Sequence, residues 1–412
     1  MSILRVAILG AGGRGQGFSS ILGNRPHRAK VVGVAEPRDA YREKVAKDHG
    51  LDPKAQFKGW RDFLAAPKFA DAVVIATMDR EHREPAVACL EKGYHVLLEK
   101  PMAVTLEDCR LIEAAQRRSG KVVAVCHSLR YHKAFRKLRD LASEGRLGRL
   151  ITLDQLEQVG YWHQAHSFVR GNWANQGRSS FMLMAKSCHD IDYIAYLVGK
   201  PCLRVSSFGA LTHFKADQAP PGATDRCTDG CPAENSCPYS AVRLYAQGDL
   251  NRWPANTIGL EHTMEAHMKA LREGPYGRCV YKVDNDVVDH QVVTMEFADD
   301  ITATFTMTGF TQDMGRKIRV HGTAGDAEFD EGGITLKTYG TTRERIDFAA
   351  ESGGHGGGDD RVVDNWLDAV EKADPTLALA NAQESLRTHT IVFAAEKARL
   401  ERRVVELSEF SR

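Results

Sequence analysis

The sequence predicts two domains of different class: an α/β domain with a parallel sheet, then an α+β domain with an open, mainly antiparallel sheet. Three observations lead to this prediction. The chain has 412 residues, which is too many for one core of ordinary size. Its first part alternates short apolar strands with amphipathic helices, a pattern typical of a parallel sheet covered on both faces. Its later strands alternate apolar and polar residues, as antiparallel strands with one solvated or helix-covered face do.

The first domain is expected at residues 1–126, where the strands are almost entirely apolar. These strands are predicted at 4–10, 30–36, 71–77, 95–100 and 121–127. Helices should lie between them: one from about Gly15, one ending at Gly50, and two more at 83–93 and 106–120.

A glycine turn follows the first strand directly. Gly10, Gly12 and Gly15 form G-x-G-x-x-G, which permits a tight turn, close approach of the backbone to a pyrophosphate, and tight helix–strand packing. Glu36 ends the second strand, where a Rossmann domain places the carboxylate that binds a ribose. This carboxylate favours NAD because it repels a 2′-phosphate, whereas the nearby Arg38 offers the opposite preference. We therefore expect NAD as the cofactor, with NADP as the alternative.

The second domain is expected at residues 127–412. Alternating strands are predicted at 150–159, 291–297, 301–310 and 317–329, and residues 182–199 have the apolar spacing of one core helix. A long insertion at about 212–280 separates the sheet strands.

Composition excludes several classes of function. A formal net charge of +1 argues against a nucleic-acid or membrane-surface partner. The start of the chain has no signal-peptide pattern, and no stretch has the length of a membrane span. The nine cysteines are dispersed over a long chain, which suits a reducing compartment. We expect a cytoplasmic protein.

The stretch "ATMDREHREPAVACLEKGYHVLLEKPMA" (76–103) resembles the glucose–fructose oxidoreductase/inositol dehydrogenase (Gfo/Idh/MocA) family. The glycine turn, His82, Glu99-Lys100-Pro101 and residues 130–151 fit that family in order. The resemblance implies an NAD(P)-dependent oxidoreductase acting on a sugar, polyol or related compound, with its active site between the domains. It also implies a homo-oligomer that forms through the C-terminal sheet. The residues it assigns to the cofactor are those of the glycine turn with Arg14, Glu36, Arg38, Thr77, His82, Glu99 and Lys100.

The same resemblance gives Lys100 and His189 their roles. The family's lysine contacts the nicotinamide ribose and the reacting hydroxyl, and its histidine is the general base. Residues 182–199 match at His189 and Asp192, but Ala185 stands where the family has an aspartate. Lys186 precedes His189 by three residues and could assist it. The alternative is a Lys186–Asp190 ion pair beside a hydrogen-bonded core histidine.

Two other segments carry candidate ligands for a substrate. Residues 161–173 read as a loop in which His166, Arg170 and Trp173 suit a sugar, although a packed interface loop explains them as well. "GGHGGGDDR" (353–361) reads as a flexible loop before a helix at Val362, and its glycines could let His355 close over a ligand.

The insertion contains clustered cysteines. Cys227, Cys231 and Cys237 lie close together, and Cys279 is the candidate for a fourth ligand. Such thiolates suggest a structural zinc or iron–sulfur site, although the C-x3-C and C-x5-C spacings are unusual. The alternatives are buried free thiols or a redox-sensitive pair.

Two further functions remain open at this point. The lost aspartate at Ala185 is compatible with a redox-neutral, NAD-dependent glycoside hydrolase of the same family. The same pocket could also serve a non-catalytic sensor of a sugar or of the cofactor.

Overall fold

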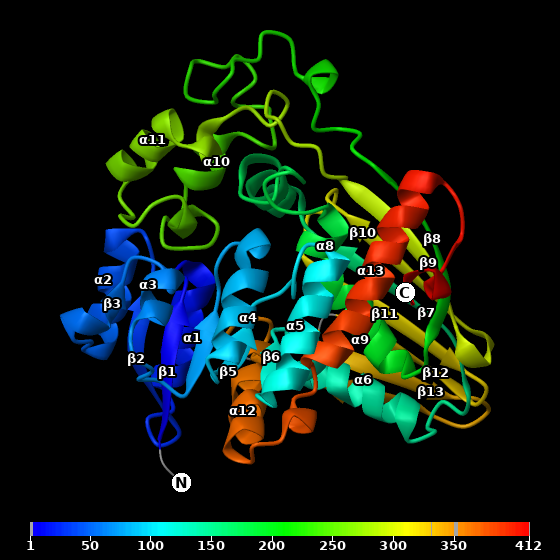
Figure 1. Ribbon diagram of the computed structural model, residues 1–412. Coiled ribbons are helices and arrows are strands. Elements are labelled where there is room, and N and C mark those ends of the chain that lie inside the picture. The colour runs from blue at the N-terminus through cyan, green and yellow to red at the C-terminus, as the bar shows by residue number, and fades with distance from the viewer. Residues whose placement is uncertain (1–2, 331, 350–352, 412) are drawn as a thin grey trace.

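The first part of the chain builds a six-stranded parallel sheet, as predicted. The computed structural model describes residues 3–330, 332–349 and 353–411 (Figure 1). All neighbouring strands of this sheet run parallel, in the order β3-β2-β1-β4-β5-β6. The order reverses at β1, and ligands bind such sheets at the carboxyl ends of the strands beside this reversal. The strands are β1 (Leu4–Leu9), β2 (Ala29–Ala35), β3 (Gln56–Phe57), β4 (Ala72–Ile75), β5 (His95–Leu98) and β6 (Val123–Val125).

Helices cover both faces of this sheet. Val6 on one face packs with Phe18 of α1 and with Trp366 of α12, a helix from late in the chain. Leu9 on the opposite face packs with Ile112 of α5. The division at residue 126 therefore stays a prediction, because a late helix completes the core of the first sheet. The helices are α1 (Gly13–Gly23), α2 (Asp39–His49), α3 (Trp60–Ala65), α4 (Arg83–Glu91), α5 (Leu106–Ser119) and α12 (Gly358–Glu371).

The second sheet has nine strands in the order β14-β13-β12-β11-β7-β10-β9-β8-β15. Its pairs are antiparallel except β7 with β10, which run parallel. The prediction of a mainly antiparallel sheet is therefore confirmed, and the parallel pair was not predicted. The strands are β7 (Leu150–Gln158), β8 (Cys202–Ala210), β9 (His290–Phe297), β10 (Ile301–Thr308), β11 (Gly315–Gly322), β12 (Gly325–Asp330), β13 (Gly333–Thr338), β14 (Arg343–Asp347) and β15 (Val405–Glu406).

One face of the second sheet is covered by helices. Buried residues such as Leu153 and Phe305 pack against α6 (Lys133–Ser143), α9 (Cys188–Val198) and α13 (Ala382–Glu401). Helix α13 lies between the two sheets, since Val392 belongs to the core of the second sheet and Ala382 to that of the first. No helix in the described part of the chain is long and apolar enough to cross a membrane.

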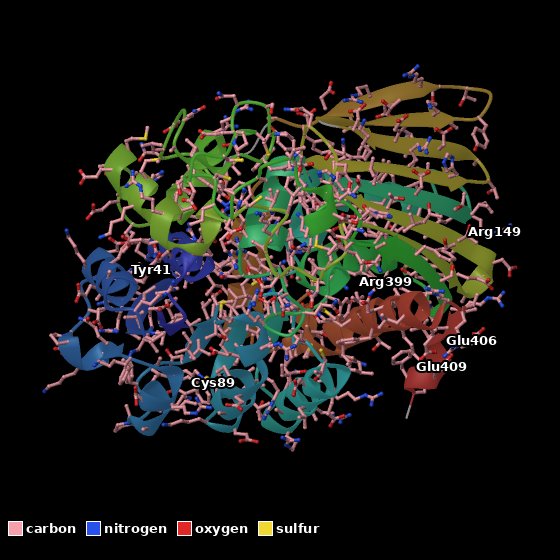
Figure 2. All side chains as sticks on the ribbon, turned by 90° about the horizontal axis from the view of Figure 1, so that it is seen from above. Tyr41, Cys89, Arg149, Arg399, Glu406 and Glu409 are labelled. Atoms are coloured by element: carbon pink, nitrogen blue, oxygen red, sulfur yellow. The ribbon has the colours of Figure 1, made fainter. Side chains whose placement is uncertain are left out.

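The insertion leaves the second sheet after β8 and returns at β9. It contains two short helices, α10 (Ala241–Tyr245) and α11 (Met264–Glu273), which have a small core of their own. Figure 1 shows these helices above the first sheet, and the view from above places them beside Tyr41 on α2 (Figure 2). The insertion thus extends from one domain to the other.

Candidate active site

The glycine turn between β1 and α1 is shaped by close backbone contacts. A Cβ on Gly10 would lie 2.5 Å from the carbonyl oxygen of Ala76, and φ at Gly10 is +89°. A Cβ on Gly15 would lie 1.9 Å from the carbonyl oxygen of Gly10. Gly12 is different, since a Cβ placed on it would have Arg38 Nη2 as its nearest neighbour, at 3.6 Å. Gly10 and Gly15 are therefore packed against backbone, whereas the space beside Gly12 is open. This open space fits a pyrophosphate at the start of α1.

Glu36 lies at the end of β2 beside this turn. Its carboxylate accepts hydrogen bonds from the backbone N–H of Ala11 (2.8 Å) and from Arg38 Nε (2.6 Å). Burial would raise the pKa of Glu36, but the hydrogen bonds from Arg38 and Ala11 outweigh it, so the pKa lies below its ordinary value. The carboxylate is therefore ionised, while the half-exposed Arg38 guanidinium beside it could meet a phosphate.

A cavity of about 420 Å³ opens next to the turn. This volume suits part of a cofactor. The residues that line it include Gly10, Ala35, Pro37, Trp60, Thr77 and Arg80. The cavity brings the predicted Thr77 to the same site as the glycine turn.

Lys100 lies just beyond β5, at the carboxyl edge of the first sheet. Its Nζ donates a hydrogen bond to the carbonyl oxygen of Ala185 in the second half of the chain (2.6 Å). Its backbone N–H donates to Glu99 (2.5 Å), and Glu99 in turn pairs with Arg14 of α1. Lys100 thus lies where the edge of the first sheet meets the second domain.

His82 contacts backbone on both sides. Its Nδ1 lies 2.7 Å from the carbonyl oxygen of Pro101, and its Nε2 lies 3.3 Å from that of Thr77. Because the ring is buried between these carbonyls, it ties the turn after β4 to the segment after β5. Its assignment to the cofactor site stays a prediction.

The single helix predicted at 182–199 is wrong. Two helices occupy this range, α8 (Met182–Ala185) and α9 (Cys188–Val198), with a break between them. The break turns Lys186 toward the second sheet, where its Nζ pairs with Glu157 of β7 at 2.8 Å.

The alternative pairing of Lys186 with Asp190 is also wrong. Asp190 pairs with Arg316 of β11 at 2.6 Å and accepts a hydrogen bond from Gln155 at 2.5 Å. These partners come from strands distant in sequence, so they do not follow from helical spacing.

His189 lies in the first turn of α9 and is 3% exposed. Its ring centroid is 5.2 Å from that of His355 and 6.0 Å from that of His127. Burial, followed by the charge of Lys100, lowers the pKa of His189 well below its ordinary value. The imidazole is therefore neutral at pH 7 and can accept a proton.

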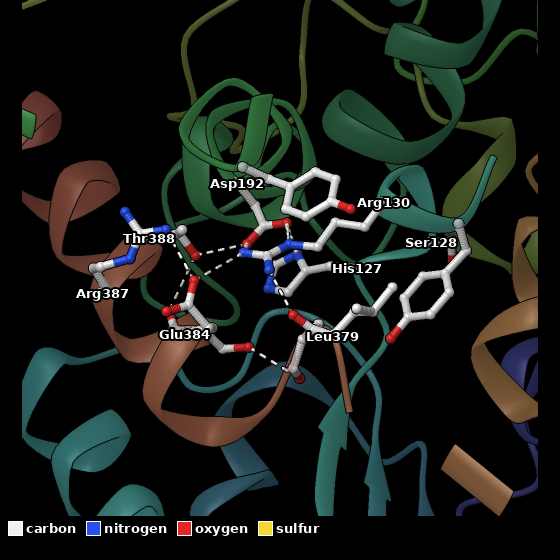
Figure 3. A network of polar contacts seen from close by, with 12 residues as sticks. His127, Ser128, Arg130, Asp192, Leu379, Glu384, Arg387 and Thr388 are labelled. Carbon is white, nitrogen blue, oxygen red and sulfur yellow. Dashed lines mark hydrogen bonds and ion pairs between the residues drawn. The ribbon is translucent and has the colours of Figure 1, made fainter. Parts of the chain in front are cut away.

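A buried ion pair fixes α9 against the rest of the fold (Figure 3). Arg130 Nε and Nη2 donate to the two carboxylate oxygens of Asp192 at 2.7 and 2.8 Å. Thr388 of α13 donates to the same carboxylate at 2.8 Å, and Arg130 Nη1 donates to the carbonyl oxygen of Leu379 at 2.6 Å. Asp192 therefore holds the helix that carries His189.

The glycine-rich segment at 353–360 is not a free loop. Helix α12 begins at Gly358, earlier than the predicted Val362. A Cβ on Gly354 would lie 2.0 Å from Asp359 Oδ2, and one on Gly356 would lie 2.7 Å from His132 Nε2. This packing places His355 beside His189. A high local density of glycine is shared by flexible loops and by such close-packed segments, so the sequence alone does not distinguish them.

The loop predicted at 161–173 is mostly helical. Residues Tyr161–His163 form α7, and Gln164–Arg170 form a π-helix. One histidine of this segment, His163, is partly buried, and the burial of its ring followed by the charge of Lys186 lowers its pKa well below the ordinary value. The charge of Lys100 lowers the pKa of His163 in the same direction. In the sequence, only the aromatic residues around His163 could have indicated it as a candidate site residue.

The predicted substrate ligands in this segment have partners within the protein. His166 Nδ1 lies 3.0 Å from the hydroxyl of Tyr245, and burial followed by Arg170 lowers the pKa of His166 to about 3. Arg170 donates to the carbonyl oxygens of Arg278 and Tyr239, at 2.7 Å each. Both side chains therefore hold the insertion in place.

Trp173 contacts the first domain. Its Nε1 donates to Asp79 Oδ2 at 2.9 Å, next to the turn after β4. This contact joins the segment after α7 to the edge of the parallel sheet.

The four predicted metal ligands, Cys227, Cys231, Cys237 and Cys279, line one cavity in the insertion. All are free thiols, and the described residues contain no group of three or more His, Cys, Asp or Glu side chains arranged to hold a metal. Burial raises the pKa of Cys237 and of Cys279. The expected zinc or iron–sulfur site is therefore not supported.

Comparisons with known proteins identify the same two-part organisation. Residues 4–127 match a family described as "Oxidoreductase family, NAD-binding Rossmann fold", and residues 139–407 match its "C-terminal alpha/beta domain". The YteT protein of Bacillus subtilis is 24% identical over 318 residues, 72% of this chain and 71% of the relative. An inositol 2-dehydrogenase of Streptomyces avermitilis is 31% identical over 226 residues, 54% of this chain and 60% of the relative.

Solved structures share the fold. Levoglucosan dehydrogenase in complex with NADH and L-sorbose superposes with a TM-score of 0.74 at 17% identity, covering 99% of each chain. The aldose-aldose oxidoreductase of Caulobacter crescentus gives a TM-score of 0.69 at 15% identity, covering 98% of this chain and 100% of the other.

Proposed function

The chain belongs to the Gfo/Idh/MocA family of NAD(P)-dependent oxidoreductases, and we propose that it oxidises or reduces one hydroxyl carbon of a sugar, polyol or sugar-derived compound. The observation that carries this proposal is the contact of Lys100 with the last residue of α8, just before the break that leads to the helix bearing His189. Lys100 Nζ lies 2.6 Å from the carbonyl oxygen of Ala185, four residues before His189. This contact supports the proposal that Lys100 and His189 act on one substrate from opposite domains.

Each residue has a distinct task in this reaction. A bound nicotinamide would accept or return the hydride of the hydroxyl carbon. Lys100 donates a hydrogen bond to the reacting oxygen and stabilises negative charge that develops on it. His189, neutral at pH 7, accepts the hydroxyl proton during oxidation and returns it during reduction. Lys186, held by Glu157, positions the substrate beside them.

NAD is the proposed cofactor. The ionised Glu36 beside the glycine turn would accept hydrogen bonds from the adenosine ribose and repel a 2′-phosphate. Arg38 is bonded to Glu36 and would have to leave it to hold such a phosphate. The pairing therefore favours NAD over NADP.

The substrate class is inferred from chemistry and from relatives. The inositol 2-dehydrogenases and the levoglucosan dehydrogenase among the relatives are named for polyols and for a sugar. In this chain, Lys100 and His189 would supply hydrogen-bonding groups to a ligand with several hydroxyl groups.

Turnover of a sugar and polyol panel with NAD, followed by NADH absorbance, tests the proposal. His189→Ala should lower kcat by roughly 10²–10⁴-fold while NAD affinity is retained, because the base is lost and the cofactor site is intact. The exposed His27 gives a matched control, and His27→Ala should keep full activity. Full turnover by His189→Ala, or release of product without net NADH, would refute the assignment.

The open face of the second sheet is the proposed surface for a homo-oligomer. Phe208 is 72% exposed there, and Val292, its partner across the strands, is 38% exposed. Adjacent exposed apolar side chains of this kind often mark a surface that is buried against another protein chain. Light scattering should give a mass above that of one chain, and Phe208→Lys should lower it. An unchanged mass would contradict this surface.

A further inference from the structure

Asp359 is the centre of a buried charge network near His189. Its Oδ1 accepts a hydrogen bond from Ser128 Oγ at 2.5 Å and faces His355 Nδ1 at 3.0 Å. Its Oδ2 accepts from Arg14 Nη1 at 2.6 Å. Burial would raise the pKa of Asp359, but the His355 hydrogen bond and the Arg14 charge lower it well below its ordinary value. The carboxylate is ionised, so it holds the Nδ1–H of His355.

The backbone fixes His355 in this position. His355 has φ of +52°, and the two glycines that follow it have φ of +57° and +72°. Residues other than glycine rarely adopt a positive φ, and such a backbone conformation persists only when surrounding contacts enforce it. Here the enforcing contacts are Gly354 against Asp359 and Gly356 against His132. The imidazole of His355 is 30% exposed, so it reaches both the buried site and solvent.

A proton on His189 needs a neighbouring group that can accept it. His189 Nδ1 is buried and makes no hydrogen bond within the described residues. After burial, the groups whose charges lower its pKa are Lys100 beyond β5, His355, His127 beyond β6 and Arg316 of β11. None of these is a carboxylate, and the positive charges oppose retention of a proton on His189. A proton taken from substrate therefore has to move on.

We propose that His355, oriented by Asp359, exchanges the substrate proton with His189 and connects it to solvent. This inference rests on the proposed function of His189. During oxidation the hydroxyl O–H bond breaks and its proton passes to His189, while a bound nicotinamide dinucleotide in its oxidised form would accept the hydride of the carbon. His189 then releases the proton to His355, which returns one to water. Ring centroids 5.2 Å apart are within the range of direct ring contact.

The network also reaches the cofactor turn. Arg14 of α1 binds both Asp359 and Glu99, the residue that precedes Lys100. Loss of the Asp359 charge should therefore disturb cofactor binding as well as His355. Loss of the His355 ring should affect proton transfer alone. This difference gives the test two separate readouts.

The first experiment compares His355→Gln with wild-type protein. We expect kcat to fall roughly 10²-fold, the pH dependence of kcat to shift, and NAD affinity measured by calorimetry to stay unchanged. Asp360→Asn is the matched control, because this neighbouring carboxylate pairs with Arg25 and should leave all three quantities unaltered. Full activity of His355→Gln beside an inactive His189→Ala would overturn the inference and leave the proposed function standing.

A second experiment needs no turnover. NMR signals of the histidine rings in cofactor-free protein report each titration separately. Asp359→Asn should shift the ring signals of His355, because the carboxylate that accepts its Nδ1–H is replaced by an amide. His355→Gln should shift the titration or chemical shift of His189. His189 ring signals that are unchanged by His355→Gln at every pH would refute the proton exchange, whether or not a substrate is known.

Discussion

Replacement of Asp192 by alanine should destabilise the protein strongly, because it leaves the guanidinium of Arg130 buried without its counter-charge. Arg130 is 1% exposed and Asp192 is 0% exposed. Two hydrogen bonds of 2.7 and 2.8 Å join them. Removal of one partner from a buried pair costs about 3–5 kcal/mol, a large part of the roughly 5–15 kcal/mol that stabilises a typical domain.

Urea unfolding at pH 7 measures this loss, provided that the slope of the transition is unchanged. Asp48→Ala is the matched control, because Asp48 forms an exposed pair with Lys44 that is worth at most about 1 kcal/mol. The double variant Arg130→Met/Asp192→Leu should recover part of the loss, because no charge then remains unpaired. Equal stability of Asp192→Ala and Asp48→Ala would refute the reasoning.

The same pair predicts a pH dependence. Burial would raise the pKa of Asp192, but Arg130 outweighs it and holds that pKa at about 2, below the ordinary value. A lowered carboxyl pKa contributes stability that is complete above the unfolded pKa of about 4. Wild-type stability should therefore fall as the pH drops from about 4 toward 2, and the double variant should show a smaller fall in this range.

Three other changes give distinct outcomes. Gly12→Val should abolish NAD binding in calorimetry while the protein stays folded, because the space at Gly12 is open to the cofactor; unchanged affinity would contradict this turn as the pyrophosphate site. Glu36→Ala should raise the NADP/NAD ratio of kcat/KM, and a constant ratio would exclude Glu36 as the ribose ligand. Trp366→Ala should cost about 3–5 kcal/mol in urea unfolding, whereas Leu111→Ala, at a side chain 41% exposed, should cost far less; similar losses would refute the role of α12 in the first core.

The first sheet could be predicted from sequence because its signals are local. Apolar strands, a glycine turn directly after β1 and a carboxylate at the end of β2 are all defined by neighbouring residues. The alternating strands of the second sheet are equally local, although the parallel pairing of β7 with β10 is not. Pairing direction depends on how the chain returns to the sheet, which residue alternation does not encode.

The errors at the candidate site have a common physical cause, since distant partners outweigh local pattern. Lys186 leaves the helix for Glu157 on β7, and His166 and Arg170 are held by an insertion made later in the chain. The glycines around His355 predict a flexible loop, whereas contacts with Asp359 and His132 fix the segment. The local sequence pattern therefore identified these residues as candidates, but it did not predict the residues that they contact.

The place of α12 has a consequence for how the protein is made. During translation, the strands β1 to β6 leave the ribosome long before residues 358–371, yet Trp366 fills the core against β1 and α1. Until α12 is synthesised, that face of the nascent sheet has an uncovered apolar surface, which is prone to aggregation or to capture by chaperones. The nucleotide-binding half can thus reach its final packing only after almost the whole chain has been synthesised.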